Sequence, residues 1–519
     1  MFKNVRIILF FFFFCSTPYA LDADPPLGQE PSASLSGKYK DYNVILIIAD
    51  AMRYDHLSCY GYAKETSPNI DQLAKHGVIF TNAFSQSHNT LGSVVSIFTS
   101  LYPSSHCVEH IFKDSTPDNI YTLADILNIY GYKTAWFGPL QDPHTSMSKN
   151  LLKGFNEVLD LHEGYAQIFN IIKKRQDEHF FITIHSYSTH ENSLINGESG
   201  YLYDKKSVLF KRLESYYVKA WEKMYHTCKN NPEELDKIFG KGWSSKNAKY
   251  FALPYSDKSF NKIQQLLDSA FKRYSFNKII KLGQKQLFFK TLNDEDLLIL
   301  LSLLDDAIHG LDKDLIGGLI RELKENNLYD KTIIIITADH GNEYREHGHI
   351  GHQAYLYDEI IKVPLLFHIP FLNKAVKIGG LVQSIDILPT VLELLNIPAP
   401  YSVQGISLVG QIEGKPGAIA NDYVFAKTIP GSFAIRSKQY KLIQKNTEDG
   451  NLFYEFYNLK DDPLERNNLI HTELGIADIL KAELKSKLIS LPKYNRKNSE
   501  FIPEIDSKTR ERIKKTGYW

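Results

Sequence analysis

Two runs of aliphatic and β-branched residues stand out along the chain, and each ends at an aspartate. Residues 43–49 lead into Asp50, and residues 332–338 lead into Asp339. A continuous apolar run of this length, bounded by polar residues, predicts a strand that is buried on both faces, as in a parallel sheet. Open α/β sheets bind their ligands beyond the carboxyl ends of the strands, so both carboxylates are expected at a functional edge.

Strand-like runs alternate with helical segments from residue 41 to about residue 400. Residues 122–130 and 311–326, for example, have the pattern of helices and are each followed by a strand-like run. This alternation indicates βαβ units and predicts an α/β fold, with a large, mostly parallel sheet flanked by helices. We therefore expect a catalytic domain at 41–400.

The pattern changes after residue 400. Four short strand-like runs, VFAKTI, FAIRS, YKLIQK and FYNL, precede a helical segment near 476–489. They predict a smaller subdomain at 401–492 that combines an antiparallel sheet with a helix. A second unit is expected on length as well, because 519 residues exceed what a single core usually supports. The tail at 493–519 is polar and basic, and we assign no chemistry to it.

The N-terminus has the three regions of a secretory signal peptide. Lys3 and Arg6 precede an apolar run at 7–15, and small residues follow up to Ala20. The run is too short to span a bilayer, which needs about 20 apolar residues. We expect residues 1–20 to be cleaved from an exported protein, periplasmic or extracellular, and no transmembrane segment to remain in the mature chain. The segment 21–40, rich in Pro, Ser and Gly, predicts a flexible lead-in.

The net charge of the chain argues against nucleic acid as a partner, and the insertion at 191–295 is locally basic. The chain has 60 Lys and Arg against 60 Asp and Glu, so no overall field favours nucleic acid. Residues 191–295 form an aromatic insertion, and 191–290 hold 19 Lys and Arg against 10 Asp and Glu. Two interpretations stay open. The insertion attracts an anionic polymer or headgroup, or it is a surface segment whose lysines are merely solvated.

The second aspartate begins a cluster of potential ligands. His340 follows it directly, and four histidines fall within thirteen residues, the last of them being His352. A single histidine is usually structural, whereas imidazoles and carboxylates gathered at strand ends are more often metal ligands or acid and base groups. Asp50, Asp339 and His340 therefore predict a metal site.

These residues lie within stretches that resemble the sulfatase family of the alkaline phosphatase superfamily. The stretches occur in the family's order and cover most of the chain outside the insertion: 43–62, 66–87, 96–106, 131–138, 326–367, 384–398 and 456–469. The resemblance implies the alkaline phosphatase/sulfatase-like fold, a divalent metal and the hydrolysis of anionic esters.

The chain departs from the family at the nucleophile. Sulfatases carry a Cys or Ser in the pattern C-x-P-x-R, which matures to formylglycine, and counting back from Pro103 places Thr90 at this position. Gly92 stands for the proline and Val94 for the arginine. A threonine cannot become formylglycine. Related branches, the nucleotide pyrophosphatase/phosphodiesterases and the phosphoglycerol or phosphoethanolamine transferases, use a metal-bound threonine on phosphodiesters, and Thr90 fits that role.

The resemblance also implies the other site residues. Thr90 is expected as a fourth ligand of one divalent ion. Mixed oxygen and nitrogen ligands favour Zn²⁺ or Mn²⁺, with Ca²⁺ or Mg²⁺ as alternatives. Two-metal relatives need an aspartate where this chain has Ser186. We expect His190, His352 and Lys133 to contact the substrate anion or the leaving group, and His185 to be less important than His190.

We interpret the chain as an exported, metal-dependent hydrolase or transferase of phosphate-diester or sulfate esters, with Thr90 as its nucleophile. Two alternatives remain. One is a sulfatase-like binding protein that has lost turnover, and the other is a sulfuric ester hydrolase that works without formylglycine. The sequence does not distinguish them.

Overall fold

The computed structural model describes residues 34–108, 114, 116–117, 120–138, 150–161, 164–190, 294–372, 375–428, 431–446 and 451–492. The expected signal peptide, most of the lead-in, residues 191–293 of the insertion and the tail lie outside these residues. Residues 35–40 differ from the expected flexible lead-in, because Tyr39 is buried in the main core and donates its hydroxyl to the Pro370 carbonyl. The lead-in therefore ends before Leu35.

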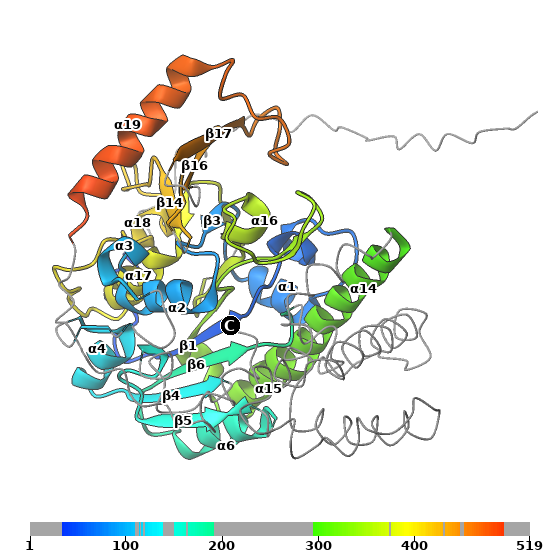
Figure 1. Ribbon diagram of the computed structural model, residues 1–519. Coiled ribbons are helices and arrows are strands. Elements are labelled where there is room, and N and C mark those ends of the chain that lie inside the picture. The colour runs from blue at the N-terminus through cyan, green and yellow to red at the C-terminus, as the bar shows by residue number, and fades with distance from the viewer. Residues whose placement is uncertain are drawn as a thin grey trace, which may run out of the picture. The chain divides into compact units, whose positions relative to one another are not determined.

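An eight-stranded sheet forms the centre of the molecule (Figure 1). In spatial order its strands are β12 (Val376–Ile378), β2 (Gly77–Phe80), β11 (Leu365–His368), β7 (Thr332–Thr337), β1 (Asn43–Ala49), β6 (Phe180–Ser186), β4 (Lys133–Gly138) and β5 (Glu157–Asp160). Only β11 runs antiparallel to its neighbours. The expected mostly parallel sheet is confirmed, and β1, β6 and β7 are fully buried, as their unbroken apolar runs predict.

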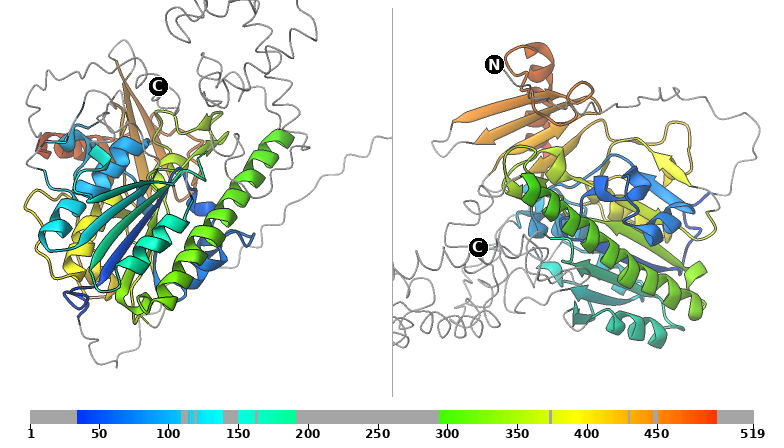
Figure 2. Two further views of the ribbon diagram at one scale, coloured as in Figure 1. Left: turned by 90° about the horizontal axis from the view of Figure 1, so that it is seen from below. Right: turned by 90° about the vertical axis from the view of Figure 1, so that its right-hand side faces the viewer.

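Helices cover both faces of the sheet (Figure 2, left). The first group comprises α2 (Thr90–Thr99), α3 (Pro103–His106), α4 (Leu123–Ile129), α17 (Ile387–Leu394) and α18 (Val409–Ile412). The second comprises α1 (Pro68–Ala74), α6 (Ala166–Lys174), α14 (Asp294–Gly310) and α15 (Gly317–Glu325). A π-helical segment, η4 (Leu311–Ile316), joins α14 to α15. Every helix in the described part of the chain is too short or too polar to cross a bilayer.

The four short runs after residue 400 form the expected antiparallel sheet. Its strands are β14 (Val424–Lys427), β15 (Phe433–Arg436), β16 (Tyr440–Asn446) and β17 (Leu452–Asn458), and α19 (Leu474–Ser490) packs against β15 and β16. Smaller elements complete the structure: β3 (Ala83–Phe84), β10 (Lys362–Val363), β13 (Val382–Gln383), the hairpin β8 (Glu343–Tyr344) and β9 (Ile350–Gly351), and the one-turn helix α16 (Asp358–Ile361).

Candidate functional site

The three central strands bring distant residues together. β1 pairs in parallel with β6 on one side and β7 on the other, with Ala49 opposite Ser186 and Ile48 opposite Thr337. Because the strands are parallel and in register, their carboxyl ends meet at one edge of the sheet. Asp50, His185 and Asp339 therefore converge there, although they come from three remote parts of the sequence.

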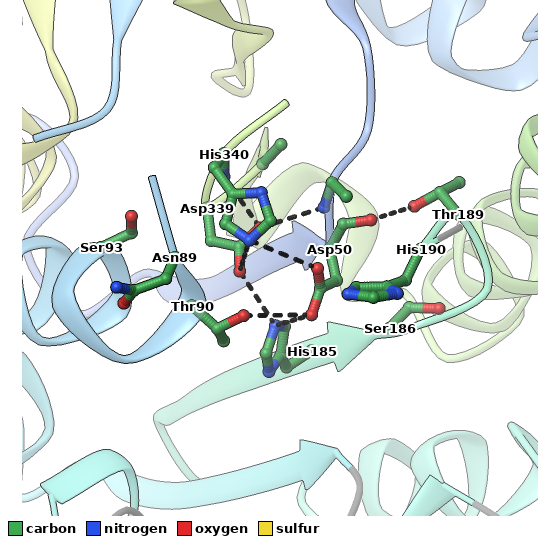
Figure 3. A network of polar contacts seen from close by, with 12 residues as sticks. Asp50, Asn89, Thr90, Ser93, His185, Ser186, Thr189, His190, Asp339 and His340 are labelled. Carbon is green, nitrogen blue, oxygen red and sulfur yellow. Dashed lines mark hydrogen bonds and ion pairs between the residues drawn. The ribbon is translucent and has the colours of Figure 1, made fainter. Parts of the chain in front are cut away.

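Asp50, Asp339 and His340 form a compact, buried group (Figure 3). His340 Nε2 lies 3.7 Å from Asp50 Oδ1 and 3.6 Å from Asp339 Oδ2. One ligand atom of each residue lies within 4.8 Å of the others, and all three side chains are inaccessible to solvent. The structure thus brings together the three residues that the sequence predicts as metal ligands.

Hydrogen bonds on the outer side of the group fix its orientation. Asp339 Oδ1 accepts the backbone N–H groups of Ala51 and His340, which turns Oδ2 inward. His340 Nδ1 donates to the Gly341 carbonyl at 2.8 Å, so Nε2 is the ring nitrogen that faces the carboxylates. Ala51 adopts the left-handed conformation with φ of 58°, which makes the sharp turn after Asp50.

Electrostatics favour the ionised form of Asp339. Complete burial raises the pKa of a carboxyl, but the neighbouring imidazoles of His340 and His185 and the donated backbone N–H outweigh it. The pKa of Asp339 is consequently well below its ordinary value. A carboxylate that stays ionised is the form that binds a cation.

Thr90 is the first residue of α2, beside this group. Asn89 caps the helix by accepting the Gly92 N–H, and Thr90 Oγ1 lies 3.4 Å from Asp50 Oδ2. A Cβ at residue 92 would lie 2.6 Å from Ser87 Oγ, so the turn has no room for the proline of the formylglycine pattern. Val94, which we expect to replace the arginine of the pattern, is buried in the core.

His190 and His352 form a pair next to the group. Their Nε2 atoms lie 3.1 Å apart, and the His352 ring packs against His340 with centroids 4.2 Å apart. His352 Nδ1 donates to the His88 carbonyl at 3.2 Å, so in a neutral His352 the Nε2 atom accepts and His190 donates. Both predicted histidines therefore adjoin the metal-ligand group.

Lys133 does not reach the site, and this expectation is wrong. It is the exposed first residue of β4 and pairs with Phe180, at the amino end of β6. The site lies at the carboxyl ends of these parallel strands, a full strand length away. In the matching stretch 131–138, the sequence begins Gly-Tyr-Lys, and the lysine is the first residue of β4.

Two histidines that the sequence undervalued lie at the site. His185 Nε2 lies 3.7 Å from Asp50 Oδ2 and 3.8 Å from Asp339 Oδ2, so it is closer to the carboxylates than expected. His88 lies near His340, and its burial, with the charge of His340, lowers its pKa to about 3. Its position two residues before Thr90 is the signal that could have identified it.

The donor set fits one divalent ion. Asp339 Oδ2 and His340 Nε2 are buried and have no hydrogen-bond partner among the described residues, which is costly unless a cation binds them. In the described part of the chain no further group of three potential ligands lies equally close. Ser186 Oγ, where two-metal relatives have a carboxylate, lies 3.1 Å from Ser188 Oγ.

Comparison with known proteins agrees with this geometry. The sulfatase family model matches residues 42–397, and the model of the C-terminal region of N-sulphoglucosamine sulphohydrolase matches 345–494. Among curated relatives, the N-acetylglucosamine-6-O-sulfatase of Bacteroides thetaiotaomicron is 23% identical over 86% of each chain. The Delta 4,5-hexuronate-2-O-sulfatase of the same organism is 22% identical, covering 82% of this chain and 84% of its own.

Solved structures share the fold. A protein solved in complex with its substrate D-glucosamine-2-N,6-O-disulfate superimposes with a TM-score of 0.60 at 20% identity, covering 86% of this chain and 97% of its own. The phosphonate monoester hydrolase of Agrobacterium radiobacter also gives 0.60, at 19% identity over 87% and 95% of the two chains. Since the sulfatase model matches well over half of the sequence, the chain belongs to the sulfatase family and is a hydrolase of sulfuric or phosphoric esters.

Proposed function

We propose that the protein is an exported, metal-dependent hydrolase of phosphodiesters in which Thr90 is the nucleophile. One observation carries the proposal. The Thr90 hydroxyl lies at the N-terminus of a buried helix, 3.4 Å from a carboxylate of the candidate metal group. We infer that it takes the place of the sulfatase formylglycine. Asp50, Asp339, His340 and Thr90 would hold the ion.

A bound divalent ion lowers the pKa of a hydroxyl and neutralises the charge of a phosphoryl oxygen. The residues of this chain do the remaining work. The Thr90 hydroxyl, which donates to Asp50 Oδ2, gives up its proton and Oγ1 forms a bond to phosphorus. The bond to the ester oxygen breaks, and the departing alkoxide takes up one proton to leave as the alcohol. Water then attacks the phosphothreonine, and Thr90 leaves with the bonding electrons and regains its proton.

The histidine pair is placed to serve the leaving group. In an in-line displacement the nucleophile and the leaving group lie on opposite sides of phosphorus. Thr90 and His190 lie on opposite sides of the Asp50 carboxylate (Figure 3). His190 Nε2 faces His352 Nε2 at 3.1 Å, so the pair can hold a proton beside the departing oxygen. A transferase reaction would differ only in the acceptor that resolves the phosphothreonine.

The nucleophile decides between phosphate and sulfate. Hydrated formylglycine expels sulfate through its second hydroxyl, and threonine has none. A threonine ester of either acid must be resolved by direct attack, and the related branches that use a metal-bound threonine act on phosphodiesters, so we take phosphodiesters as the better substrates. The sulfated sugars named for the relatives favour a second candidate, a sulfate esterase that works without formylglycine. We further propose that the basic insertion 191–295 binds the anionic part of the substrate, polymeric or a headgroup.

The test compares the parent protein with three variants, all loaded with metal, on bis(4-nitrophenyl) phosphate and 4-nitrophenyl sulfate. Thr90→Ala should lower kcat on the phosphodiester by at least about a thousandfold while the metal stays bound, because the nucleophile is gone. Thr90→Ser keeps an oxygen and should retain partial activity. Thr99→Ala is the matched control, since the hydroxyl of Thr99 is bonded to the Val95 carbonyl at 2.7 Å within the same helix.

Near-normal kcat in Thr90→Ala would reject the nucleophile and point to activated water. A marked preference of the parent protein for the aryl sulfate would favour the second candidate. Metal binding without turnover of either ester would favour a binding protein.

A further inference from the structure

His185 is buried at the carboxyl end of β6 and points into the metal-ligand group. It is completely buried, and neither ring nitrogen has a hydrogen-bond partner among the described residues. Its Nε2 lies 3.7 Å from Asp50 Oδ2 and 3.8 Å from Asp339 Oδ2, which is beyond hydrogen-bond length. A polar side chain aimed at two carboxylates at this distance needs an explanation.

The separations match those between ligands of one ion. Two donors bound at about 2.1 Å with a tetrahedral angle lie about 3.4 Å apart, and wider angles increase the distance. His340 Nε2 lies 3.7 Å and 3.6 Å from the same two carboxylates, and Thr90 Oγ1 lies 3.4 Å from Asp50. His185 and His340 thus lie at similar distances from Asp339 Oδ2, and each faces a different oxygen of Asp50, His185 facing Oδ2 and His340 facing Oδ1.

Packing holds the imidazole in this position. The ring lies edge-on to Trp136, with centroids 5.6 Å apart, and 4.8 Å from the Tyr187 ring. Both aromatic side chains restrict its rotation. His185 and His340 approach the two carboxylates from opposite sides, and Thr90 lies beside them (Figure 3).

We propose that His185 is a further ligand of the metal ion, an inference that rests on the proposed function. The ligand set is then two carboxylates, two imidazoles and one hydroxyl. Imidazole nitrogen favours Zn²⁺, Mn²⁺ and Co²⁺, whereas Ca²⁺ and Mg²⁺ prefer oxygen. His185 therefore sets which metal the centre selects, and Zn²⁺ binds in preference to Ca²⁺.

The experiment measures dissociation constants of Zn²⁺ and Ca²⁺ for the metal-stripped full chain. His185→Gln and the similarly sized His185→Phe should each raise the Kd for Zn²⁺ at least about tenfold and change the Kd for Ca²⁺ much less. His340→Gln should also weaken Zn²⁺ binding. His179→Gln is the matched control, because His179 is exposed at the other end of the same strand.

A second measurement separates ligation from packing. The visible spectrum of the Co²⁺-loaded protein reports the atoms bound to the ion, so it should change in both His185 variants and stay unchanged in His179→Gln. Both His185 variants must unfold at the same denaturant concentration as the parent. If their Co²⁺ spectra and Zn²⁺ affinities are then unaltered, His185 is not a ligand, and the rest of the metal site still stands. A parent protein that binds neither Zn²⁺ nor Ca²⁺ would instead overturn the proposed metal dependence.

Discussion

At the scale of single residues, the site depends on close backbone contacts as much as on its ligands. Gly341 follows His340, and its N–H donates to the Ile360 carbonyl. A Cβ at Gly341 would lie 2.2 Å from the Glu359 carbonyl oxygen. The loop that carries His340 is therefore pressed against α16, and this contact requires a glycine.

Gly341→Ala should move this loop and weaken the metal centre. We expect the free energy of unfolding to fall by about 1–3 kcal/mol, because backbone atoms must shift to admit the methyl group. Zn²⁺ affinity should fall with it, since His340 moves too. Gly475→Ala is the control: a Cβ there meets nothing within 4 Å, and stability should hold or rise slightly. Denaturant titration and Zn²⁺ titration measure both effects, and a Gly341→Ala variant equal to the parent in both would contradict this account.

Residues at strand ends could be predicted from sequence, and residues defined by side-chain direction could not. Asp50 and Asp339 follow unbroken apolar runs, so the edge on which they lie was evident. Lys133 was misplaced, because a motif gives no information on which end of its strand faces the site. His185 was undervalued, since a strand buried on both faces shows no alternation that would reveal where the imidazole points.

At the scale of elements, a buried ion network joins the C-terminal sheet to the catalytic domain. Lys441 of β16 is completely buried and lies 2.8 Å from Asp358 of α16 and 2.7 Å from Glu465. Arg436 of β15 adds a contact to Asp358 at 3.2 Å. Because α16 also packs against the Gly341 loop, the network fixes the small sheet to the element that supports His340.

Lys441→Ala should destabilise the protein strongly. The change leaves the buried Glu465 and the half-buried Asp358 with less positive charge, and breaking a buried pair typically costs about 3–5 kcal/mol. Lys481→Ala is the comparison, because it removes a partly exposed pair with Asp478 at 2.9 Å and should change stability by less than about 0.5 kcal/mol. Urea unfolding of the two variants gives the answer, and equal midpoints would show that the network contributes nothing.

A second buried carboxyl links η6 (Ser384–Asp386) to the loop beyond α17. Asp386 accepts the backbone N–H groups of Gln383 and Ile406 and the side-chain amide of Asn421. Burial is the larger effect and raises the pKa of Asp386 to about 7. Below this pH the folded protein holds a proton that the unfolded chain loses near pH 4.

The raised pKa predicts how stability depends on pH. Between about pH 4 and pH 7 the folded state binds more protons at Asp386 than the unfolded state does. The contribution of Asp386 to the free energy of unfolding therefore falls as pH rises. The slope is at most about 1.4 kcal/mol per pH unit. Asp386→Asn cannot titrate and should flatten the profile by this amount. Parallel profiles for parent and variant, from denaturation at several pH values, would refute the assignment.

The sequence predicts the order and type of the helices and strands better than the residues at which they begin and end. The four C-terminal strands and their helix were all foreseen from short apolar runs. Helix α14 begins at Asp294 and continues through a π-helical segment into α15. The irregular hydrogen bonding of the π-helical segment leaves no periodic signal in the sequence. Residues 294 and 295, the last two assigned to the insertion, belong to α14.

At the scale of the whole molecule, the N-terminal pattern makes a prediction about processing. Lys3 and Arg6, the apolar run and the small residues up to Ala20 predict removal of the leader during export. Mass spectrometry of protein from an exporting host should find a mature N-terminus near Leu21 or Asp24. Replacing the apolar run with polar residues should retain the full-length chain in the cytosol. Recovery of the parent protein in the cytosol with Met1 intact would contradict the prediction.

The order of the strands in the central sheet determines when the proposed metal site can form. The Asp339 side chain accepts the backbone N–H of Ala51, and the two residues are 288 positions apart in the sequence. A growing or half-folded chain presents Asp50 alone, and isolated carboxylates hold divalent ions only weakly. An ion held by both aspartates would therefore enter after β7 has joined β1, and it would stabilise the finished fold by mass action. Metal uptake would then report the completion of folding, and scarcity of the ion would leave a folded, inactive protein ready for later loading.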